Sequence, residues 1–221
     1  AVSSLAAIFA GVILSVSGMQ SMDPHITSLV PVLKSPWLTF HVAVIVGAYG
    51  FLGLSFMAGL SDLVLMAFLP FAEETGRISR RVREICVLNE MSMWIGLVLL
   101  TVGTFLGAVW ANESWGRYWG WDPKETWALI TILIYTLTTH VHLLKTKVPQ
   151  WTFSFMSVVS FSSVLMTFLG VNHFLSGMHS YAQNEAMSSA FLWIGAGVIF
   201  IIILSVLSYI AAVRSNMDIM K

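Results

Sequence analysis

The residues with the clearest chemical potential are five tryptophans in one short stretch, WANESWGRYWGWDPKETW (110–127). They are five of the nine tryptophans in the chain: Trp110, Trp115, Trp119, Trp121 and Trp127. An interfacial aromatic belt at a membrane surface needs only about one or two Trp or Tyr residues per helix end. Five in one connection therefore indicate a surface for a flat, apolar and polarizable ligand, with Gly116 and Gly120 leaving room near the backbone.

Histidines add a metal-binding capacity to this aromatic surface. The chain has six of them: His25, His41, His140, His142, His173 and His179. We expect His41 and His179 to lie on the same side of the membrane as the tryptophans, at similar depth. Two imidazoles beside an aromatic floor are typical of a bis-histidine haem site. Zinc is the alternative, but it usually takes about three or four ligands and needs no tryptophans.

The other histidines are expected to differ in depth. His140 lies some 15 residues into an expected helix, hence deep in the membrane, where ionisable groups indicate function by default. His142 follows two residues later, about 200° round a helix. We therefore expect it on the opposite face, near the membrane edge, unable to bind the same metal. For His25 and His173 the sequence favours structural roles.

The composition is that of an integral membrane protein. Of 221 residues, 57% are hydrophobic and only 10% are charged, whereas soluble domains carry about 25% charged residues. A formal net charge of zero argues against a nucleic-acid partner and leaves membrane lipid as the surroundings. The single cysteine, Cys86, excludes an internal disulfide and a thiol pair.

Hydropathy predicts one all-α domain, a polytopic transmembrane bundle of about six helices within residues 1–221. A spanning helix needs about 20 mostly apolar residues. The expected segments are 1–19, 37–69, 90–110, 124–145, 151–174 and 187–213. Because the chain starts at Ala1 in an apolar segment, we expect a processed or fused piece of a longer polypeptide.

Basic residues predict the orientation of these helices. Eight of the eleven Lys and Arg residues fall in the 70–90 connection, the 145–150 turn and the C-terminal tail. Since cytoplasmic loops are enriched in Lys and Arg, these regions are expected to be cytoplasmic. The tryptophan-rich connection would then be extracytoplasmic.

Two local patterns predict structure rather than chemistry. Asp122, Pro123 and Glu125 form a helix start, with an N-cap, a proline at the first position and a capping-box glutamate. Gly103 and Gly107 form a small-xxx-small pair that is typical of close helix packing.

Three separated motifs resemble the CcsA (ResC) family of System II cytochrome c biogenesis. WGRYWGWDPKETW (115–127) resembles its tryptophan-rich WWD signature. SPWLTFHV (35–42) resembles the segment that carries the first external haem-ligand histidine, and GVNHFLSGMHSYA (170–182) the segment that carries the second. These matches correspond to His41 and His179, and His140 falls where the family has a histidine inside the membrane.

The resemblance implies a holocytochrome c synthase that works with a CcsB (ResB) partner, either a separate chain or a fused domain. Haem b would cross the membrane through a site that includes His140. It would then be held by His41 and His179, with Trp115, Trp119, Trp121 and Asp122 of the signature around the porphyrin. Arg117 or Lys124 would pair with a propionate. The acceptor would be a CXXCH apocytochrome c, and the membrane a bacterial plasma membrane or a thylakoid membrane.

The sequence indicates no catalytic nucleophile, so the protein would act by positioning haem vinyl groups and substrate thiols. Three alternatives stay open. The protein could export haem to a chaperone, as the related CcmC branch does, or be a bis-histidine electron-transfer cytochrome. The third is a transporter for another aromatic solute.

Overall fold

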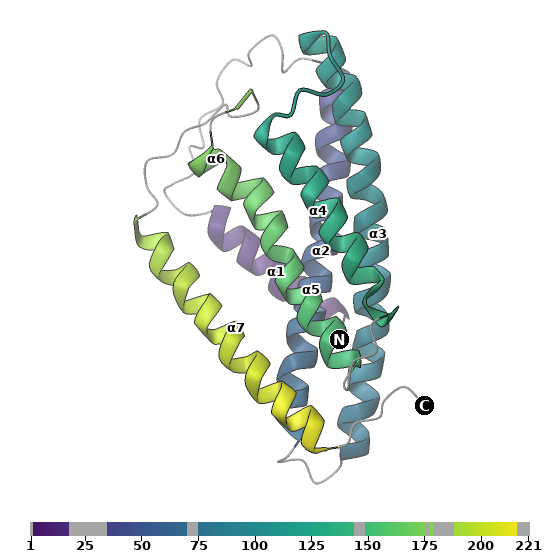
Figure 1. Ribbon diagram of the computed structural model, residues 1–221, viewed down its shortest axis with the longest axis vertical. Coiled ribbons are helices and arrows are strands. Elements are labelled where there is room, and N and C mark those ends of the chain that lie inside the picture. The colour runs from purple at the N-terminus through teal and green to yellow at the C-terminus, as the bar shows by residue number, and fades with distance from the viewer. Residues whose placement is uncertain are drawn as a thin grey trace.

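The computed structural model describes residues 2–17, 35–69, 75–143, 149–175, 177–178 and 188–215. Every regular element among these residues is helical (Figure 1). In order they are α1 (Val2–Ser17), α2 (Pro36–Ala67), α3 (Thr75–Trp115), α4 (Pro123–Thr139), the 3₁₀ turn η3 (Val141–Leu143), α5 (Pro149–Leu165), the π-helix η4 (Met166–Gly170), α6 (Val171–Phe174) and α7 (Ser188–Arg214). The predicted polytopic helical bundle is confirmed.

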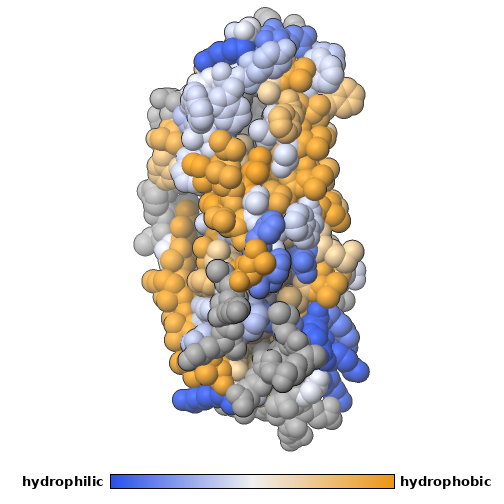
Figure 2. Space-filling model, turned by 45° about the vertical axis from the view of Figure 1, so that its right-hand side comes forward, coloured by the Kyte–Doolittle hydropathy of each residue, from blue (hydrophilic) through white to orange (hydrophobic). Residues whose placement is uncertain are grey.

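Four helical segments of the described chain are long and apolar enough to cross a membrane. They are Pro36–Ala67, Gly76–Trp115, Pro149–Gly170 and Ile194–Arg214. Figure 2 shows the matching surface, an apolar band between hydrophilic ends. The remaining two predicted segments correspond to α1 and α4, which have 16 and 17 residues and are shorter than the roughly 20 that a span requires. The protein is thus a multi-pass membrane protein.

The largest departure from the prediction is the start of α3. We expected a helix from residue 90, but α3 begins at Thr75 and includes the arginine-rich run. Hydropathy detects only the apolar part of a helix, whereas the hydrogen-bonded backbone continues into the polar region.

Glycines on α3 let it pack closely against the antiparallel α2. A Cβ atom added at any of three glycines would approach an α2 side chain within 2.6–2.7 Å. The pairs are Gly96 with Leu52, Gly103 with Ile45, and Gly107 with His41. Along α3 the glycines are spaced by seven and then four residues, and along α2 their partners are spaced by seven and then four residues in the opposite direction. These matching spacings are what a single line of contact between two antiparallel helices requires. The predicted packing role of Gly103 and Gly107 is confirmed, since small residues let membrane helices approach.

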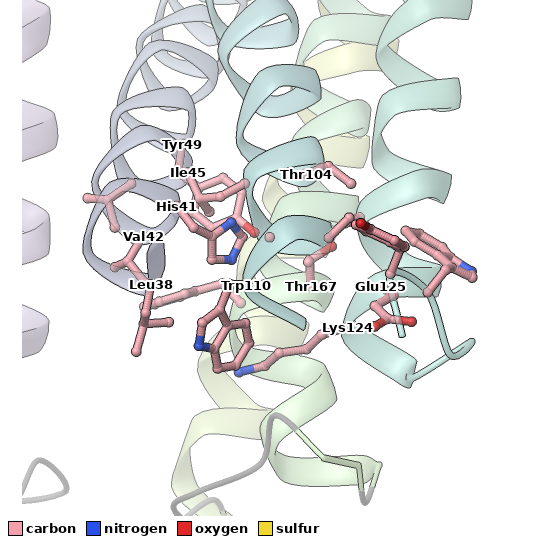
Figure 3. A pocket seen from close by; sticks show the side chains of 17 residues that line it. Leu38, His41, Val42, Ile45, Tyr49, Thr104, Trp110, Lys124, Glu125 and Thr167 are labelled. Atoms are coloured by element: carbon pink, nitrogen blue, oxygen red, sulfur yellow. The ribbon is translucent and has the colours of Figure 1, made fainter. Parts of the chain in front are cut away.

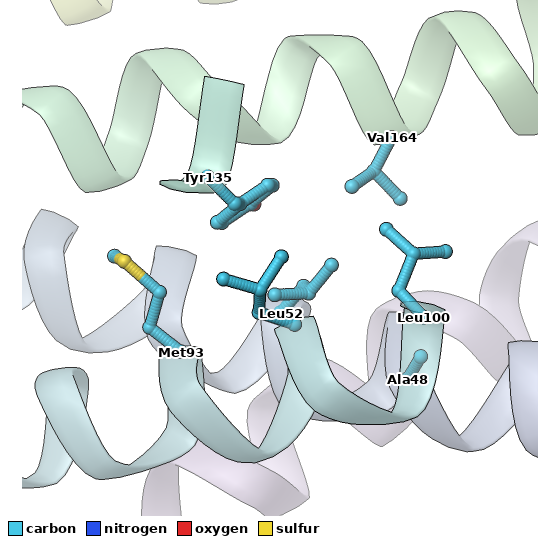
Figure 4. Packing of buried hydrophobic residues seen from close by; sticks show 7 residues of the cluster. Ala48, Leu52, Met93, Leu100, Tyr135 and Val164 are labelled. Carbon is cyan, nitrogen blue, oxygen red and sulfur yellow. The ribbon is translucent and has the colours of Figure 1, made fainter. Parts of the chain in front are cut away.

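An apolar cluster joins α2, α3, α4 and α5 beside this seam (Figure 4). Its buried members are Ala48, Leu52, Met93, Leu97, Leu100, Tyr135 and Val164. Tyr135 is fully buried and brings α4 onto the α2–α3 pair. These contacts set the position of α4, and with it the position of the tryptophan-rich connection that precedes it.

Hydroxyl groups on α5 bind its neighbours by hydrogen bonds. Ser157 Oγ donates to Asn89 Oδ1 of α3 at 2.9 Å, and Ser154 Oγ donates to Asp62 Oδ2 of α2 at 2.9 Å. Thr167 Oγ1, in the π-helix, lies 3.0 Å from Thr131 Oγ1 of α4. Interhelical hydrogen bonds of this kind hold membrane bundles together. The last of them fixes α4 against the π-helix at the tryptophan-rich end.

Candidate functional site

A cavity of about 360 Å³ opens at the tryptophan-rich end of the bundle (Figure 3). α2, α3, the connection after α3, α4 and the π-helix all contribute to its wall. Its aromatic lining residues are His41, Tyr49, Trp110, Tyr118, Trp119 and Phe168. Its volume lies within the range of about 300–1,000 Å³ that is usual for small-molecule sites. The apolar wall and few polar groups suit a flat aromatic ligand.

His41 is held in one orientation by α3. Its Nδ1 lies 2.7 Å from the carbonyl oxygen of Gly103, and because a carbonyl only accepts, Nδ1 carries the proton. Nε2 therefore carries the lone pair. The ring also stacks on Trp110, with centroids 6.3 Å apart and planes at 8°. Histidines that bind metals usually donate their other ring N–H to a carbonyl or carboxylate in this way.

We expect Gly107→Ala to disturb His41 without removing it. The new methyl carbon would lie 2.6 Å from His41 Cε1, so the imidazole must move and its bond to Gly103 must lengthen. Loss of such support typically lowers metal affinity by about 10–100-fold. Haem content of the purified variant measures the effect. Gly47→Ala, where no atom lies within 4 Å, is the matched control and should bind haem normally.

Four tryptophans of the 110–127 stretch differ in their relation to the cavity. Trp110 and Trp119 line the cavity. Trp115 packs edge-on against Trp110 at 4.8 Å, and Trp121 edge-on against Trp119 at 5.7 Å. Trp121 is 70% exposed and has a φ of +57°, which is rare for a bulky residue. The sequence missed the central position of Trp110, which is 1% exposed and lies directly beneath His41 (Figure 3).

The two basic residues of this region point in different directions. Arg117 donates to Met178 Sδ and lies against Gly120, where a Cβ atom would collide with its guanidinium. Lys124 lines the cavity and extends toward Trp110 in Figure 3. Lys124 is therefore better placed than Arg117 to meet an anionic group of a ligand in the cavity.

The predicted start of α4 is confirmed in detail. Asp122 Oδ1 accepts from Lys124 N at 3.0 Å, and Glu125 Oε2 accepts from Asp122 N at 3.2 Å, which completes a capping box. Glu125 Oε2 also accepts from Gly120 N at 2.7 Å. This last bond ties the glycine-containing turn to α4, so the loop that presents Trp119 has a defined shape.

His140 and His142 form a separate pair at the other end of α4. His140 is the exposed C-cap of α4, with Nδ1 2.7 Å from the carbonyl oxygen of Thr136 and its ring against Trp94 at 6.1 Å. His142 stacks on it with centroids 6.3 Å apart. The expectation that the two rings point in opposite directions is wrong. It assumed an α-helix through residue 145, whereas the α-helix ends at Thr139, so a rotation of 100° per residue does not apply.

The structure does not describe some of the histidines considered in the sequence analysis. His179 and His25 lie outside the described residues, as does the side chain of His173. Within the described part of the chain, no three His, Cys, Asp or Glu side chains gather as metal ligands. A zinc cluster therefore finds no support among these residues. A haem iron needs only axial ligands, and His41 places one imidazole in the cavity wall.

These observations define a class, a multi-pass membrane protein with a histidine- and tryptophan-lined cavity at one end of its helical bundle. Comparison with protein families matches residues 1–179 to the family described as "Cytochrome C assembly protein". The chain therefore belongs to the cytochrome c assembly protein family, and its process is cytochrome c biogenesis.

Individual relatives agree with this assignment. The protein NrfI of Wolinella succinogenes is 46% identical over 184 residues, which are 83% of this chain and 20% of NrfI. The cytochrome c biogenesis protein CcsA of Guillardia theta is 37% identical over 183 residues, 74% of this chain and 58% of that protein. CcsA of Chlamydomonas reinhardtii is 37% identical over 163 residues, which are 74% of this chain and 44% of that protein. The chain thus spans a fifth of NrfI and about half of these CcsA proteins.

Proposed function

We propose that this chain binds haem b in the aromatic cavity and presents it for covalent attachment to a CXXCH apocytochrome c. His41 and His179 are the axial ligands of the iron. The single observation that carries the proposal is the arrangement of His41, whose Nδ1 proton is fixed by Gly103 at the edge of an aromatic cavity.

Different residues of the cavity contact different parts of the haem. Trp110 and Trp119 supply flat apolar surface for the porphyrin, and aromatic contacts add about 0.5–1.5 kcal/mol each beyond burial. Lys124 neutralises a propionate. Trp121, which is exposed and packs against Trp119, covers the edge of the porphyrin or contacts the incoming apocytochrome.

The attachment chemistry needs little more than positioning. Each substrate thiol adds across a haem vinyl group, so that sulfur bonds to one vinyl carbon and hydrogen to the other, with no net oxidation. Holding two thiols beside two vinyl groups makes the encounter effectively intramolecular. The reactive groups belong to haem and substrate, so this step requires no nucleophile from the chain.

His140 belongs to an earlier site on the haem route. Its Nδ1–H also donates to a backbone carbonyl at 2.7 Å, and its ring is exposed at the surface of the bundle. Leu133 and Leu137, seven and three residues before it on α4, are exposed too. We propose that a helix of a CcsB-type partner packs here and supplies the second ligand for a haem inside the membrane.

The test is covalent attachment in a host that lacks its own cytochrome c maturation. The full-length protein, its CcsB-type partner and a CXXCH apocytochrome are produced together, and covalent haem is detected on denaturing gels. We expect haem on the apocytochrome only when all three are present. Haem released without covalent attachment would indicate an exporter. Haem that never leaves the protein would indicate an electron-transfer cytochrome.

A further inference from the structure

The carboxylate of Asp122 does more than start α4. Only 7% of this residue is exposed, and its two oxygens accept from two different parts of the chain. Oδ1 accepts from Lys124 N at 3.0 Å, while Oδ2 accepts from Met178 N at 2.6 Å. Asp122 thus bridges the tryptophan-rich connection and a segment 56 residues away.

Gly177 makes this bridge possible. A Cβ atom at this position would lie 2.5 Å from Asp122 Oδ2 and 2.9 Å from Pro123 Cδ. The backbone at 177–178 therefore lies directly on the first turn of α4, at a distance that a larger residue would prevent. Arg117 contacts the same segment from the other side, through Met178 Sδ.

The anchored segment immediately precedes His179. α6 ends at Phe174, and Met178 is the residue next to the proposed second ligand. The anchor lies beside the cavity, because Lys124 and Glu125 of the same helical turn line it. Fixing the backbone one residue away restricts where an imidazole at position 179 can lie.

We propose that Asp122, together with Gly177, is a positioning residue that anchors the 177–178 backbone and so directs His179 to the haem iron. This inference rests on the proposed function, since it assigns a role toward the second ligand of that same site. Asp122 acts here through the chain rather than by touching the haem. The charged hydrogen bond is of the strong type, because its acceptor is ionised.

Two variants separate this role from helix capping. Asp122→Ser keeps a good N-cap, but a hydroxyl is too short to serve Lys124 N and Met178 N together. Gly177→Ala disturbs the anchor from the other side and leaves Asp122 intact. Gly47→Ala, in open surroundings, is the control.

The measurement is the visible absorption spectrum of the full-length protein, purified with its partner in the His140→Ala background and supplied with haem, so that haem binds only at the cavity. Both variants should lose six-coordinate low-spin haem by about tenfold, as expected when outer-shell support of a ligand is removed. Added imidazole should restore that spectrum, because the vacant axial position accepts it. A variant that had merely lost its fold would not respond. Hydrogen exchange of the Met178 amide, which needs no haem, should also become faster in both variants.

The outcomes distinguish this inference from the proposed function. Normal spectra and normal Met178 exchange in both variants, with loss of six-coordinate haem in His179→Ala, would overturn the anchor while the haem site stands. Faster Met178 exchange with no haem bound by the unsubstituted protein would contradict the haem site itself. The proposed role of Asp122 in positioning His179 would then be contradicted as well, while the hydrogen bond between Asp122 and Met178 N would still be part of the fold.

Discussion

A His41→Ala variant is expected to accumulate in the membrane and to attach no detectable haem to apocytochrome. The substitution removes the iron ligand whose Nδ1 proton is fixed by Gly103. It also opens a space beside Gly107 and above Trp110. Because that space has the shape of an imidazole, added imidazole should partly restore attachment.

Phe40→Ala is the matched control for this variant. Phe40 precedes His41 on α2 and is 63% exposed, so its loss should leave attachment close to the unsubstituted level. Full attachment in the His41→Ala variant would show that the histidine only packs against α3.

A second large effect is expected from His140→Ala. Total haem in the complex with the partner should fall by more than about tenfold, since even the loss of outer-shell support costs about 10–100-fold. The site in the cavity should then be starved of haem as well. Quantifying haem per mole of purified complex measures this.

His142→Ala provides the comparison at the same depth. The His142 ring stacks on His140, but its Nδ1 lies 3.2 Å from the Thr139 carbonyl oxygen, a longer contact than the 2.7 Å of His140. We expect this variant to keep most of its haem. Equal losses in both variants would argue that the pair acts as one structural unit rather than through a single ligand.

Much of the fold was predictable because it depends on local signals. Long apolar runs located the helices, and Asp122, Pro123 and Glu125 located the start of α4 to the residue. The packing glycines Gly103 and Gly107 were also recognised, although nothing in the sequence shows that His41 occupies the space beside Gly107.

The unpredicted features depend on backbone geometry that hydropathy does not record. The π-helix places Thr167 and Phe168 in the cavity wall, and the mean hydropathy of a segment does not reveal a π-helical turn. π-Helical turns are frequent at functional sites. The positive φ of Trp121 and the end of α4 at Thr139 likewise do not show in a hydropathy pattern, so the directions of Trp121 and His142 were not predicted.

The assignment of histidines as haem ligands stays a prediction. The structure describes the surroundings of two of these histidines but not of the third. His41 lies in the cavity wall and His140 on the exposed surface, whereas His179 lies outside the described residues. Its assignment depends on the sequence motif and on the neighbouring anchor at Met178.

The most direct test of the central claim is the visible absorption spectrum of the full-length protein, purified with its partner from cells that make haem. In the His140→Ala background, haem supplied to the purified complex should bind only at the cavity. The account predicts a six-coordinate, low-spin bis-histidine spectrum that is lost in His41→Ala and returns with imidazole. Absence of bound haem, or an unchanged spectrum after His41→Ala, would contradict it.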